Sequence, residues 1–578
     1  MIGVTISLGE KANKVKGIGY LKESWHFYKD ILSTNNVGVS YIGYDGYPVN
    51  YWEHSGNTVI VEGIIYNICD DDIKANLNNI IEKGYNQDLI REFIKKADGD
   101  FIVYFVNEKN NEVVAFNDIL GGLPLFYSSE GNTLFLSRQF GLIAQNLNER
   151  QWNKENIAEY LSFGYNLRQR TFLSSVYKFE PASILFASFD KKVNVEYNQL
   201  YVDDFIIENR YKNEDEAAIE LAKLLVESCH NRVNYARTHG YKIVNTMSGG
   251  FDSRTVLGVI EKDTDSYVNI TYEYVTDESQ TAQDVLSAMG SKSEYVKLSF
   301  KNTPDLYDTR LTLNTDGRIN AFTNSICYHD MLSVRKHLGE KKILYFGGFG
   351  GEFIRHPRYE TLLPLAVIGL TYSPTYYLTS KICNTTVDNL KTVFHDSFDN
   401  KKSREQRFKD FYNEYYQNLV RCSGEDRTRM FYFTVQPMMG KDFIMAIRHK
   451  VPLNWVGFSF YKKFLKEIDE RLLSIDIHGE KEGFLNDSNL KKKDFKRKVF
   501  EYFYSSYRYL NQRFSNRELR KVENTLSFDD IAAYFEVNNG SQIFNQGFIK
   551  NNYSNFDITL KYRLIAILSY ISKIENYK

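Results

Sequence analysis

Cysteine, proline and tryptophan are scarce in this sequence, which has five, nine and four of them among 578 residues. The cysteines stand far apart with no C-x-x-C pair, and the ten histidines do not cluster. Neither a zinc site nor a disulfide framework is therefore indicated. We expect a protein of a reducing, cytoplasmic compartment.

Long apolar runs are also missing. The longest, residues 362–370, contains Pro364 and falls well short of the roughly 20 residues that a helix needs to cross a bilayer. The apolar first residues reach Glu10 and Lys11 without a basic leading segment, which is typical of a first strand and not of a signal peptide. We therefore expect no membrane partner.

Neither sign of charge dominates, because 72 Lys and Arg residues stand against 73 Asp and Glu residues. Nucleic-acid-binding proteins usually carry a basic excess, so we expect no nucleic-acid partner. What the chain does contain is 43% hydrophobic residues, and aromatic residues spread along its whole length. At this length we expect two or three globular domains.

The stretch around residue 250 carries the first functional signal. Residues 242–244 form a short extended run, a Gly-Gly turn follows, and residues 255–260 continue as an apolar helix. The backbone N–H groups of such a turn and the positive end of the helix point at one place, where an anion binds. Hydroxyl groups in this stretch can donate hydrogen bonds to phosphate oxygens, and a carboxylate can bind Mg²⁺. An ordinary capped turn is the competing interpretation.

The order Ser-Gly-Gly-x-Asp-Ser resembles the PP-loop of the ATP pyrophosphatases, which cleave ATP between its α- and β-phosphates. A Walker A loop would need a Gly-Lys-Ser/Thr element, and a dinucleotide site would need G-x-G-x-x-G. The resemblance implies that ATP is bound by Ser248, Gly249, Gly250, Asp252 and Ser253, and that Asp252 also holds Mg²⁺.

A second glycine-rich segment, residues 343–353, resembles the "SGEGADE" signature of the asparagine synthetases. In that signature an acidic residue joins the PP-loop aspartate in holding Mg²⁺ and pyrophosphate. The resemblance assigns this role to Glu352 and places Gly348 and Gly350 in the ATP-binding loop. Two acidic residues that share a Mg²⁺ ion are chemically reasonable here, because the cation neutralises the charge of the leaving pyrophosphate. A helix cap is the competing interpretation of Glu352.

Two further positions bear on catalysis. Phe349 stands where asparagine synthetases have glutamate, and where the related β-lactam synthetases have a tyrosine that helps to deprotonate the attacking amine. Phenylalanine can do neither, so the base is Tyr359, Glu360 or another group, or the amine needs none. The resemblance also implies a lysine that stabilises the transition state. Lys481 lies near the expected spacing, and the run at residues 491–493 is its rival.

Residues 1–205 are rich in strand signals separated by polar turns. Within them, residues 99–127 resemble the "GDF … RD-x-x-G-x-x-P-L-Y" segment of the glutaminase domain of asparagine synthetases. Residues 61–67 resemble the "NGEIYN" of the same domain. The resemblance implies a four-layered αββα sandwich of the N-terminal-nucleophile (Ntn) type.

The residues that would hydrolyse glutamine are replaced. Relatives that hydrolyse it use a cysteine directly after the initiator methionine, where this chain has Ile2. Glu62 replaces the asparagine that holds the oxyanion, and Ile64 replaces the glutamate that orients the substrate. A carboxylate would repel the developing negative charge. Cys69 is a weak alternative nucleophile, which we expect to be a core residue. We expect a degenerate glutaminase domain.

We assign residues 206–578 to the synthetase domain of the same family, and the resemblance to that family extends as far as Lys481. After a linker at residues 201–211, strands and helices alternate as in a doubly wound parallel sheet. Residues 428–441 are predicted to be helical up to Pro437, and the tail from residue 495 onward is also predicted to be helical. The expected fold class is α/β, with an adenine-nucleotide α-hydrolase-like synthetase domain and a helical C-terminal part.

The resemblance implies an ATP- and Mg²⁺-dependent amide ligase that adenylates a carboxylate and releases pyrophosphate. Lacking ammonia from glutamine, it would take an amine from its substrate, as lasso-peptide cyclases do when they close a macrolactam. Its partners would then be a precursor peptide, a leader-binding protein and a protease. An ammonia-dependent or small-molecule amide or β-lactam synthetase is the alternative. A non-catalytic binding protein with inherited motifs is the second alternative.

Overall fold

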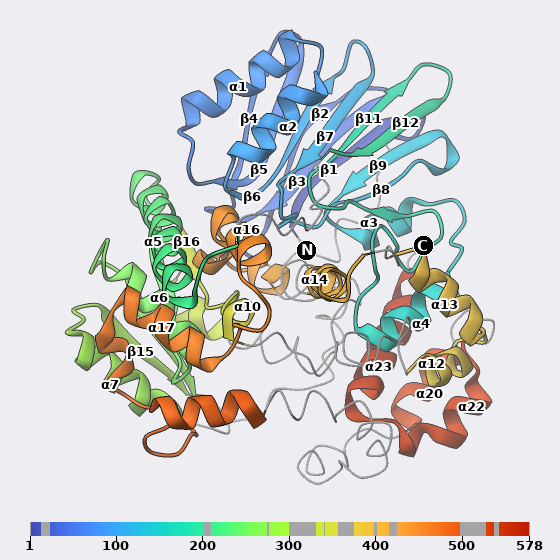
Figure 1. Cartoon of the computed structure of the whole chain (residues 1–578). Helices are drawn as coiled ribbons and strands as arrows, with labels where there is room; N and C mark the ends of the chain where they lie inside the picture. The colour runs from blue at the N-terminus through green and yellow to red at the C-terminus, as the bar shows by residue number, and fades with distance from the viewer. Residues whose placement is uncertain are drawn as a thin grey trace.

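The computed structural model of the chain describes residues 2–12, 24–200, 210–273, 277–299, 331–339, 342–355, 375–397, 402–415, 425–496, 528–536 and 543–576. Figure 1 shows a β-rich part at the top, with a parallel sheet and a group of helices below it. No helix within these ranges is long and apolar enough to cross a membrane. The α/β fold class predicted from the sequence is confirmed.

The N-terminal part is a sandwich of two antiparallel sheets with six strands each. The strand order is β10-β8-β9-β1-β3-β2 in the first sheet and β12-β11-β7-β6-β5-β4 in the second. The first sheet consists of β1 (Gly3–Gly9), β2 (Phe27–Ser33), β3 (Val37–Gly43), β8 (Phe126–Ser128), β9 (Thr133–Ser137) and β10 (Tyr177–Lys178). The second consists of β4 (Val49–His54), β5 (Asn57–Ile65), β6 (Gly99–Asn107), β7 (Glu112–Asn117), β11 (Ser183–Phe189) and β12 (Val193–Gln199).

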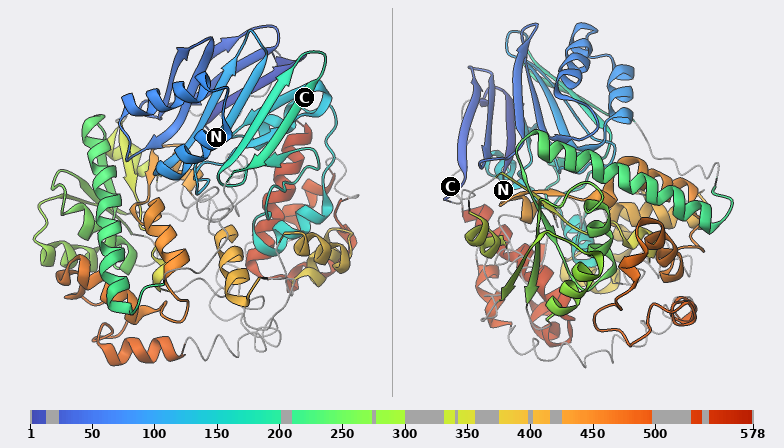
Figure 2. Two further views of the ribbon diagram at one scale, coloured as in Figure 1. Left: turned by 45° about the horizontal axis from the view of Figure 1, so that its top comes forward. Right: turned by 90° about the vertical axis from the view of Figure 1, so that its left-hand side faces the viewer.

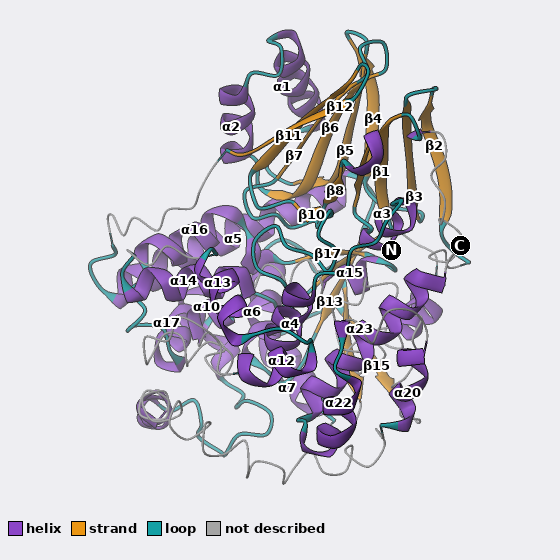
Figure 3. Cartoon of the chain, turned by 90° about the vertical axis from the view of Figure 1, so that its right-hand side faces the viewer, coloured by secondary structure: helices purple, strands orange, loops and turns teal. Residues whose placement is uncertain are grey.

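Helices α1 (Asp70–Glu82) and α2 (Gln87–Lys96) cover the outer face of the second sheet (Figure 3). They do so because each helix has one apolar face; in α2, the Phe93 ring lies 6.0 Å from the Phe101 ring of β6. The short helix α3 (Phe140–Asn146) contacts β8 and β9. This layered arrangement is the Ntn-type sandwich that the sequence predicts.

The next part is built on a five-stranded parallel sheet with the order β15-β14-β13-β16-β17. Its strands are β13 (Lys242–Thr246), β14 (Val268–Glu273), β15 (Glu294–Ser299), β16 (Ile343–Phe346) and β17 (Phe433–Val435). The associated helices are α5 (Glu214–Thr238), α6 (Phe251–Ile260), α7 (Ser279–Met289), α10 (Glu352–Arg355), α16 (Lys441–Lys450) and α17 (Phe458–Ile468). The long helix α5 runs beside this sheet (Figure 2) and contacts α17, α16 and α6. The predicted alternation of strand and helix is confirmed.

One element was predicted wrongly. Residues 433–435 form the strand β17 and not a helix, and they pair in parallel with β16. The run Phe431-Tyr432-Phe433-Thr434-Val435 is aromatic and β-branched, and such residues favour strands when a sheet edge can bury them.

The C-terminal helices pack against the N-terminal half. Arg563 of α23 donates to the carbonyl oxygens of Leu161 at 3.0 Å and Phe163 at 3.2 Å, at the end of α4. A cation is favourable there because the last carbonyls of a helix lack intrahelical partners. The helices of this region are α4 (Lys154–Phe163), α12 (Tyr376–Ile382), α13 (Val387–His395), α14 (Arg404–Tyr415), α20 (Asp529–Glu536), α22 (Gln546–Asn552) and α23 (Ile558–Asn576). The helical tail is confirmed where the structure describes it.

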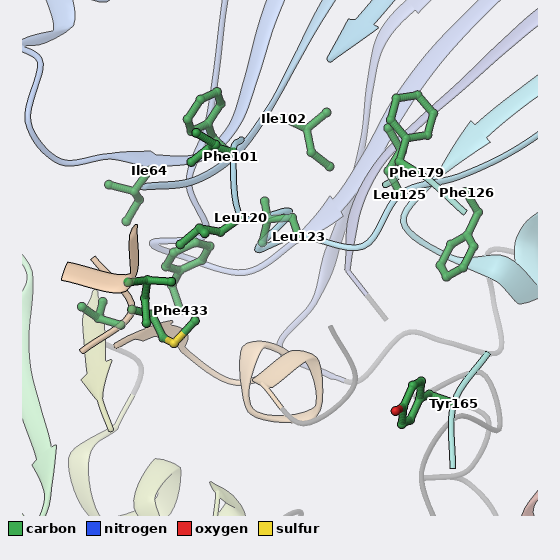
Figure 4. Close-up of a cluster of buried hydrophobic side chains, with 14 of the residues drawn as sticks. Ile64, Phe101, Ile102, Leu120, Leu123, Leu125, Phe126, Tyr165, Phe179 and Phe433 are labelled. Atoms are coloured by element: carbon green, nitrogen blue, oxygen red, sulfur yellow. The ribbon is translucent and has the colours of Figure 1, made fainter. Parts of the chain in front are cut away.

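Apolar contacts and buried charges join the two halves. Figure 4 shows Phe433 of β17 beside Leu120 of the N-terminal half. In the same region the buried Arg429, just before β17, donates to the Asp100 carboxylate at 3.0 Å. On α5, the buried Arg232 donates to Asp98 at 2.8 Å. These contacts fix the parallel sheet to the sandwich. The domain boundary predicted near residue 205 lies within residues 201–209, which are outside the described ranges.

Candidate active site

The predicted PP-loop lies at the centre of the parallel sheet. The strand β13 ends at Thr246, helix α6 begins at Phe251, and Gly250 is the N-cap of α6. Because β14 and β16 pair with β13 in parallel on either side, the carboxyl ends of all three strands meet at this edge. This edge is where open α/β sheets bind ligands.

The polar groups of the loop are gathered into a small network. The Ser248 and Ser253 hydroxyl oxygens lie 2.9 Å apart, and the Ser248 N–H donates to the Ser253 hydroxyl at 3.1 Å. The Gly250 N–H donates to the Ser248 hydroxyl at 3.2 Å. The Gly249 N–H donates to a carboxylate oxygen of Glu278 at 2.8 Å. At least one amide of the loop is thus directed toward an anionic oxygen.

The second glycine segment lies directly against this loop. A Cβ atom added to Gly348 would lie 3.0 Å from the carbonyl carbon of Asp252, and one added to Gly351 would overlap the Asp252 carboxylate. Gly350 has a φ of +116°, a value that favours glycine, and packs against Met438. The structure therefore brings the two predicted motifs together, and glycine is needed for their close approach.

Two donors among the described residues hold the Asp252 carboxylate. Its Oδ2 atom accepts from Arg355 Nη2 at 2.7 Å, and its Oδ1 atom accepts from the Tyr461 hydroxyl at 3.1 Å. Burial, and then the nearby Asp252 charge, raises the pKa of Tyr461, so Tyr461 is a donor at neutral pH. Glu352 follows Gly351 at the start of α10. The two predicted metal ligands thus begin two neighbouring helices, and their role stays a prediction.

Arg254 holds the segment after α17 against the loop, and the sequence interpretation did not single it out. This fully buried side chain donates to the carbonyl oxygens of Gly249 at 3.0 Å, Leu472 at 2.9 Å and Ile475 at 2.7 Å. Burial lowers the pKa of Arg254 to about 10, so it stays charged at neutral pH. An arginine directly after the predicted PP-loop, at the start of an apolar run, was the signal available in the sequence.

The candidate lysines, Lys481 and the run at residues 491–493, follow the segment that Arg254 holds. The N–H of His478 donates to the Gly249 carbonyl at 3.2 Å, and Lys481 is an exposed residue three positions later. Lys493 pairs with Glu480, and its Nζ lies 4.5 Å from the Phe484 ring centroid. The role of Lys481 stays a prediction. Of the candidate bases, Tyr359 and Glu360 lie outside the described residues.

Phe349 takes part in the second loop through its backbone. Its N–H donates to the side-chain oxygen of Gln436 at 3.1 Å, immediately after β17. The same amide of Gln436 lies against Gly347. The loop is therefore supported by β17, which the buried charges of the interface fix to the N-terminal half.

In the N-terminal half, Glu62 is completely buried and surrounded by donors. Arg138 Nη1 lies 3.2 Å from its Oε1 atom, the N–H of Val4 donates to its Oε2 atom at 3.1 Å, and the Tyr47 hydroxyl is a third donor. Burial raises the pKa of Glu62, although Arg138 opposes the shift. Arg138 also pairs with Asp426 of the other half. Glu62 is thus one end of an ion-pair network between the halves.

Ile2 and Ile64, at two other replaced positions of the glutaminase motif, are also buried. Ile2 and Ile64 have 3% and 1% of their surface exposed, so both are core residues. Cys69, which we expected to be buried, is exposed at the N-cap of α1. The expectation failed because the segment after β5 turns outward to begin α1.

Comparisons with known proteins support the resemblance for the N-terminal half. Residues 51–198 match the glutamine amidotransferase domain family. The chain is also similar to a protein of Methanocaldococcus jannaschii named putative asparagine synthetase [glutamine-hydrolyzing] 2, with 24% identity over 217 residues. This match covers 36% of the present chain and 41% of the relative, so the chain spans less than half of the relative's length.

Two solved structures align more loosely. One is the allosteric regulatory enzyme of purine biosynthesis, with 11% identity over 62% of this chain and 82% of that chain. The other is the glutamine phosphoribosylpyrophosphate amidotransferase of B. subtilis complexed with ADP and GMP, with 12% identity over 69% of this chain and 94% of that chain. Both TM-scores are 0.23, too low for a functional argument.

Proposed function

We propose that this protein is an ATP-dependent amide ligase of the asparagine synthetase type. The observation that carries the proposal is the meeting of two glycine loops from distant parts of the sequence at Asp252, at the carboxyl edge of a parallel sheet. The M. jannaschii relative is named putative asparagine synthetase [glutamine-hydrolyzing] 2, and its similarity to this chain supports a reaction of the same class.

The residues present fit the phosphates of ATP. Ser248, Gly249, Gly250 and Ser253 supply amides and hydroxyls at the N-terminus of α6, where the helix dipole favours an anion. Gly348 and Gly350 have no side chains, which lets the second loop pack closely against Asp252 and Met438 beside the PP-loop.

The carboxylates of Asp252 and Glu352 are oxygen donors of the kind that Mg²⁺ prefers, and they begin neighbouring helices. When bound there, Mg²⁺ would supply positive charge to the leaving pyrophosphate. The fit therefore rests on both the donor set and the glycine contacts.

The proposed reaction has two steps. A carboxylate oxygen attacks the α-phosphorus, the bond to the β-phosphate breaks, and pyrophosphate leaves. An amine nitrogen then attacks the acyl carbon, loses a proton, and AMP leaves. Lys481 is the proposed group that stabilises negative charge developing at the reacting centre, with the run at residues 491–493 as the rival.

The amine in this proposal does not come from glutamine. Glu62 brings a buried carboxylate, bonded to Arg138, to the position of the oxyanion donor. Ile2 offers no nucleophile there. We therefore propose that the N-terminal half is a structural domain. The finer proposal is closure of a macrolactam within a precursor peptide, and an ammonia-dependent or small-molecule amide synthetase is its alternative.

The test is pyrophosphate and AMP release from ATP and Mg²⁺, with wild type and Asp252→Ala side by side. Each is offered glutamine, ammonia, free amino acids and candidate precursor peptides, and glutamate release is followed in parallel. We expect Asp252-dependent pyrophosphate release without glutamate formation, and a peptide requirement would support the cyclase. Glutamate release from glutamine would contradict the inactive N-terminal half. Pyrophosphate release that is equal in both proteins would remove Asp252 from the site.

A further inference from the structure

Arg355 stands out because nothing in the sequence motifs requires a cation at this position. It is the last residue of α10, three positions after Glu352. Its guanidinium Nη2 atom donates to Asp252 Oδ2 at 2.7 Å. The other carboxylate oxygen, Oδ1, accepts from Tyr461. Both oxygens of the predicted metal ligand therefore already have donors.

The position of Arg355 is fixed by the packing around α10. The Arg355 N–H donates to the Gly351 carbonyl at 3.0 Å, and the Ile354 carbonyl accepts from the N–H of Gly457, the N-cap of α17, at 3.0 Å. The guanidinium lies 6.0 Å from the centroid of the Phe458 ring. Arg355 is therefore built into the site by two elements and is not a loosely placed surface cation.

Exposure distinguishes this ion pair from the buried pairs of the molecule. The side chains of Asp252 and Arg355 are 20% and 19% exposed, so water and a ligand can reach the pair. A carboxylate oxygen can accept a hydrogen bond and bind a cation at the same time, but the positive charge of Arg355 opposes a second cation at Asp252. Arg355 is the donor with the positive charge, so repulsion between the cations favours its departure over that of Tyr461.

An arginine released from a carboxylate beside bound phosphates has an evident new partner. The guanidinium presents five N–H donors in a planar fork that matches phosphate as well as carboxylate geometry. Moving from Asp252 to a phosphate oxygen exchanges one charge-assisted hydrogen bond for another. The move also brings a positive charge to the polyphosphate.

We propose that Arg355 is a resident cation that neutralises Asp252 in the ligand-free protein and transfers to the polyphosphate when Mg²⁺ and the nucleotide bind. The inference rests on the proposed nucleotide site and goes beyond it, because it makes Arg355 both a competitor of Mg²⁺ and a determinant of polyphosphate affinity. The ligand class is a nucleoside triphosphate or inorganic pyrophosphate.

The test measures equilibrium binding and not turnover. Calorimetry with α,β-methylene-ATP, which cannot be cleaved between its first two phosphates, gives the nucleotide affinity at saturating Mg²⁺ and the Mg²⁺ concentration for half-maximal binding. The proteins are wild type, Arg355→Met, Arg355→Lys and Lys462→Met. Lys462→Met is the matched control, because it also removes one positive charge. Lys462 follows Tyr461 on α17, but it pairs with the exposed Asp487 and not with Asp252. Thermal unfolding of each variant checks that it is folded.

For Arg355→Met we expect affinity at saturating Mg²⁺ to fall about tenfold or more, as for the loss of a charge-assisted hydrogen bond. The half-saturating Mg²⁺ concentration should fall as well, because Asp252 no longer has a competing cation. Arg355→Lys should be intermediate and Lys462→Met unchanged. If only one of the two quantities changes in Arg355→Met, or neither does, the transfer is contradicted. Absence of nucleotide binding by wild type would instead refute the proposed function itself.

Discussion

The two candidate sites of this protein each contain a carboxylate paired with an arginine, and the two pairs differ in access. The Glu62 and Arg138 side chains are 0% and 1% exposed, whereas those of Asp252 and Arg355 are 20% and 19% exposed. A buried pair cannot exchange its partner without leaving an uncompensated charge in the interior. A partly exposed pair can exchange its partner, because water and ligands reach it. We therefore propose a structural role for the first pair and a role in the reaction for the second.

The surroundings of the pairs explain the difference. Glu62 lies on β5, a strand buried along its whole length, and Tyr104 of the adjacent strand β6 adds a hydroxyl 3.3 Å from its Oε2 atom. Asp252 lies at a helix start that is bordered by Gly348 and Gly351, which have no side chains to cover it. Side chains fill the first site, whereas glycines keep the second one open.

The largest expected effect comes from removing the exposed carboxylate. We expect Asp252→Ala to lower pyrophosphate release by about 10² to 10³, the range found when one stabilising electrostatic group of an active site is removed. Stability should change little, because the pair is partly solvated. Steady-state release of pyrophosphate and urea denaturation of the same preparations measure both quantities. Activity within twofold of wild type would contradict the assignment.

Breaking the buried pair, in contrast, should mainly lower the stability of the protein. Arg138→Met leaves Glu62 without its main counter-charge in the interior, and we expect a loss of about 3–5 kcal/mol in the free energy of unfolding. Urea denaturation followed by tryptophan fluorescence measures it. The double variant Glu62→Gln with Arg138→Met should recover most of the loss, because it removes both charges and Asp426 keeps Arg429. Equal instability of single and double variants would show that Glu62 is not the cause.

A smaller change should close the open site. In Gly351→Ala, the added methyl group would overlap the Asp252 carboxylate, so we expect nucleotide affinity to fall about tenfold, equivalent to about 1.4 kcal/mol. Gly547→Ala is the matched control, since the nearest side-chain atom beyond its chain neighbours would lie 3.8 Å from its added Cβ. Gly547 lies in α22, and alanine is favourable in helices. Calorimetry with α,β-methylene-ATP compares the two, and equal affinities would argue against close packing of the loops.

The smallest expected effect is on the pH dependence of stability and concerns the interface charge Asp98. Burial acts to raise the pKa of Asp98, but Arg232 and the Lys441 N–H outweigh it, so the pKa lies below the ordinary value. A lowered folded-state pKa stabilises the protein above the unfolded value of about 3.9, and this contribution is lost as the pH falls through that value and below. The free energy of unfolding should therefore fall less steeply in acid for Asp98→Asn than for wild type. Parallel curves between pH 7 and pH 3 would contradict this.

Much of the architecture could be predicted from the sequence because local patterns and tertiary packing agree. The alternation of strand and helix after residue 211 was recognisable, and β13, α6, β14, α7 and β15 follow it in order. The two glycine motifs were visible because glycine is required where backbone and carboxylate meet.

What the sequence could not show depends on contacts between distant residues. Arg138 and Asp426 are 288 positions apart, and nothing in either local pattern indicates the pair. Arg355 and Asp252 are likewise 103 positions apart. The strand β17 is three residues long and exists because β16 offers it an edge. Tertiary context decides in each of these cases.

The most direct test of the account is hydrogen–deuterium exchange of the wild-type protein with and without Mg²⁺ and α,β-methylene-ATP. It locates the nucleotide without any substitution and without knowledge of the acid or amine. We expect slower exchange in residues 247–255 and 347–355, and unchanged exchange in β1 and β5 around Glu62. Protection around Glu62 with none at the two glycine loops would contradict the assignment of chemistry to the second half.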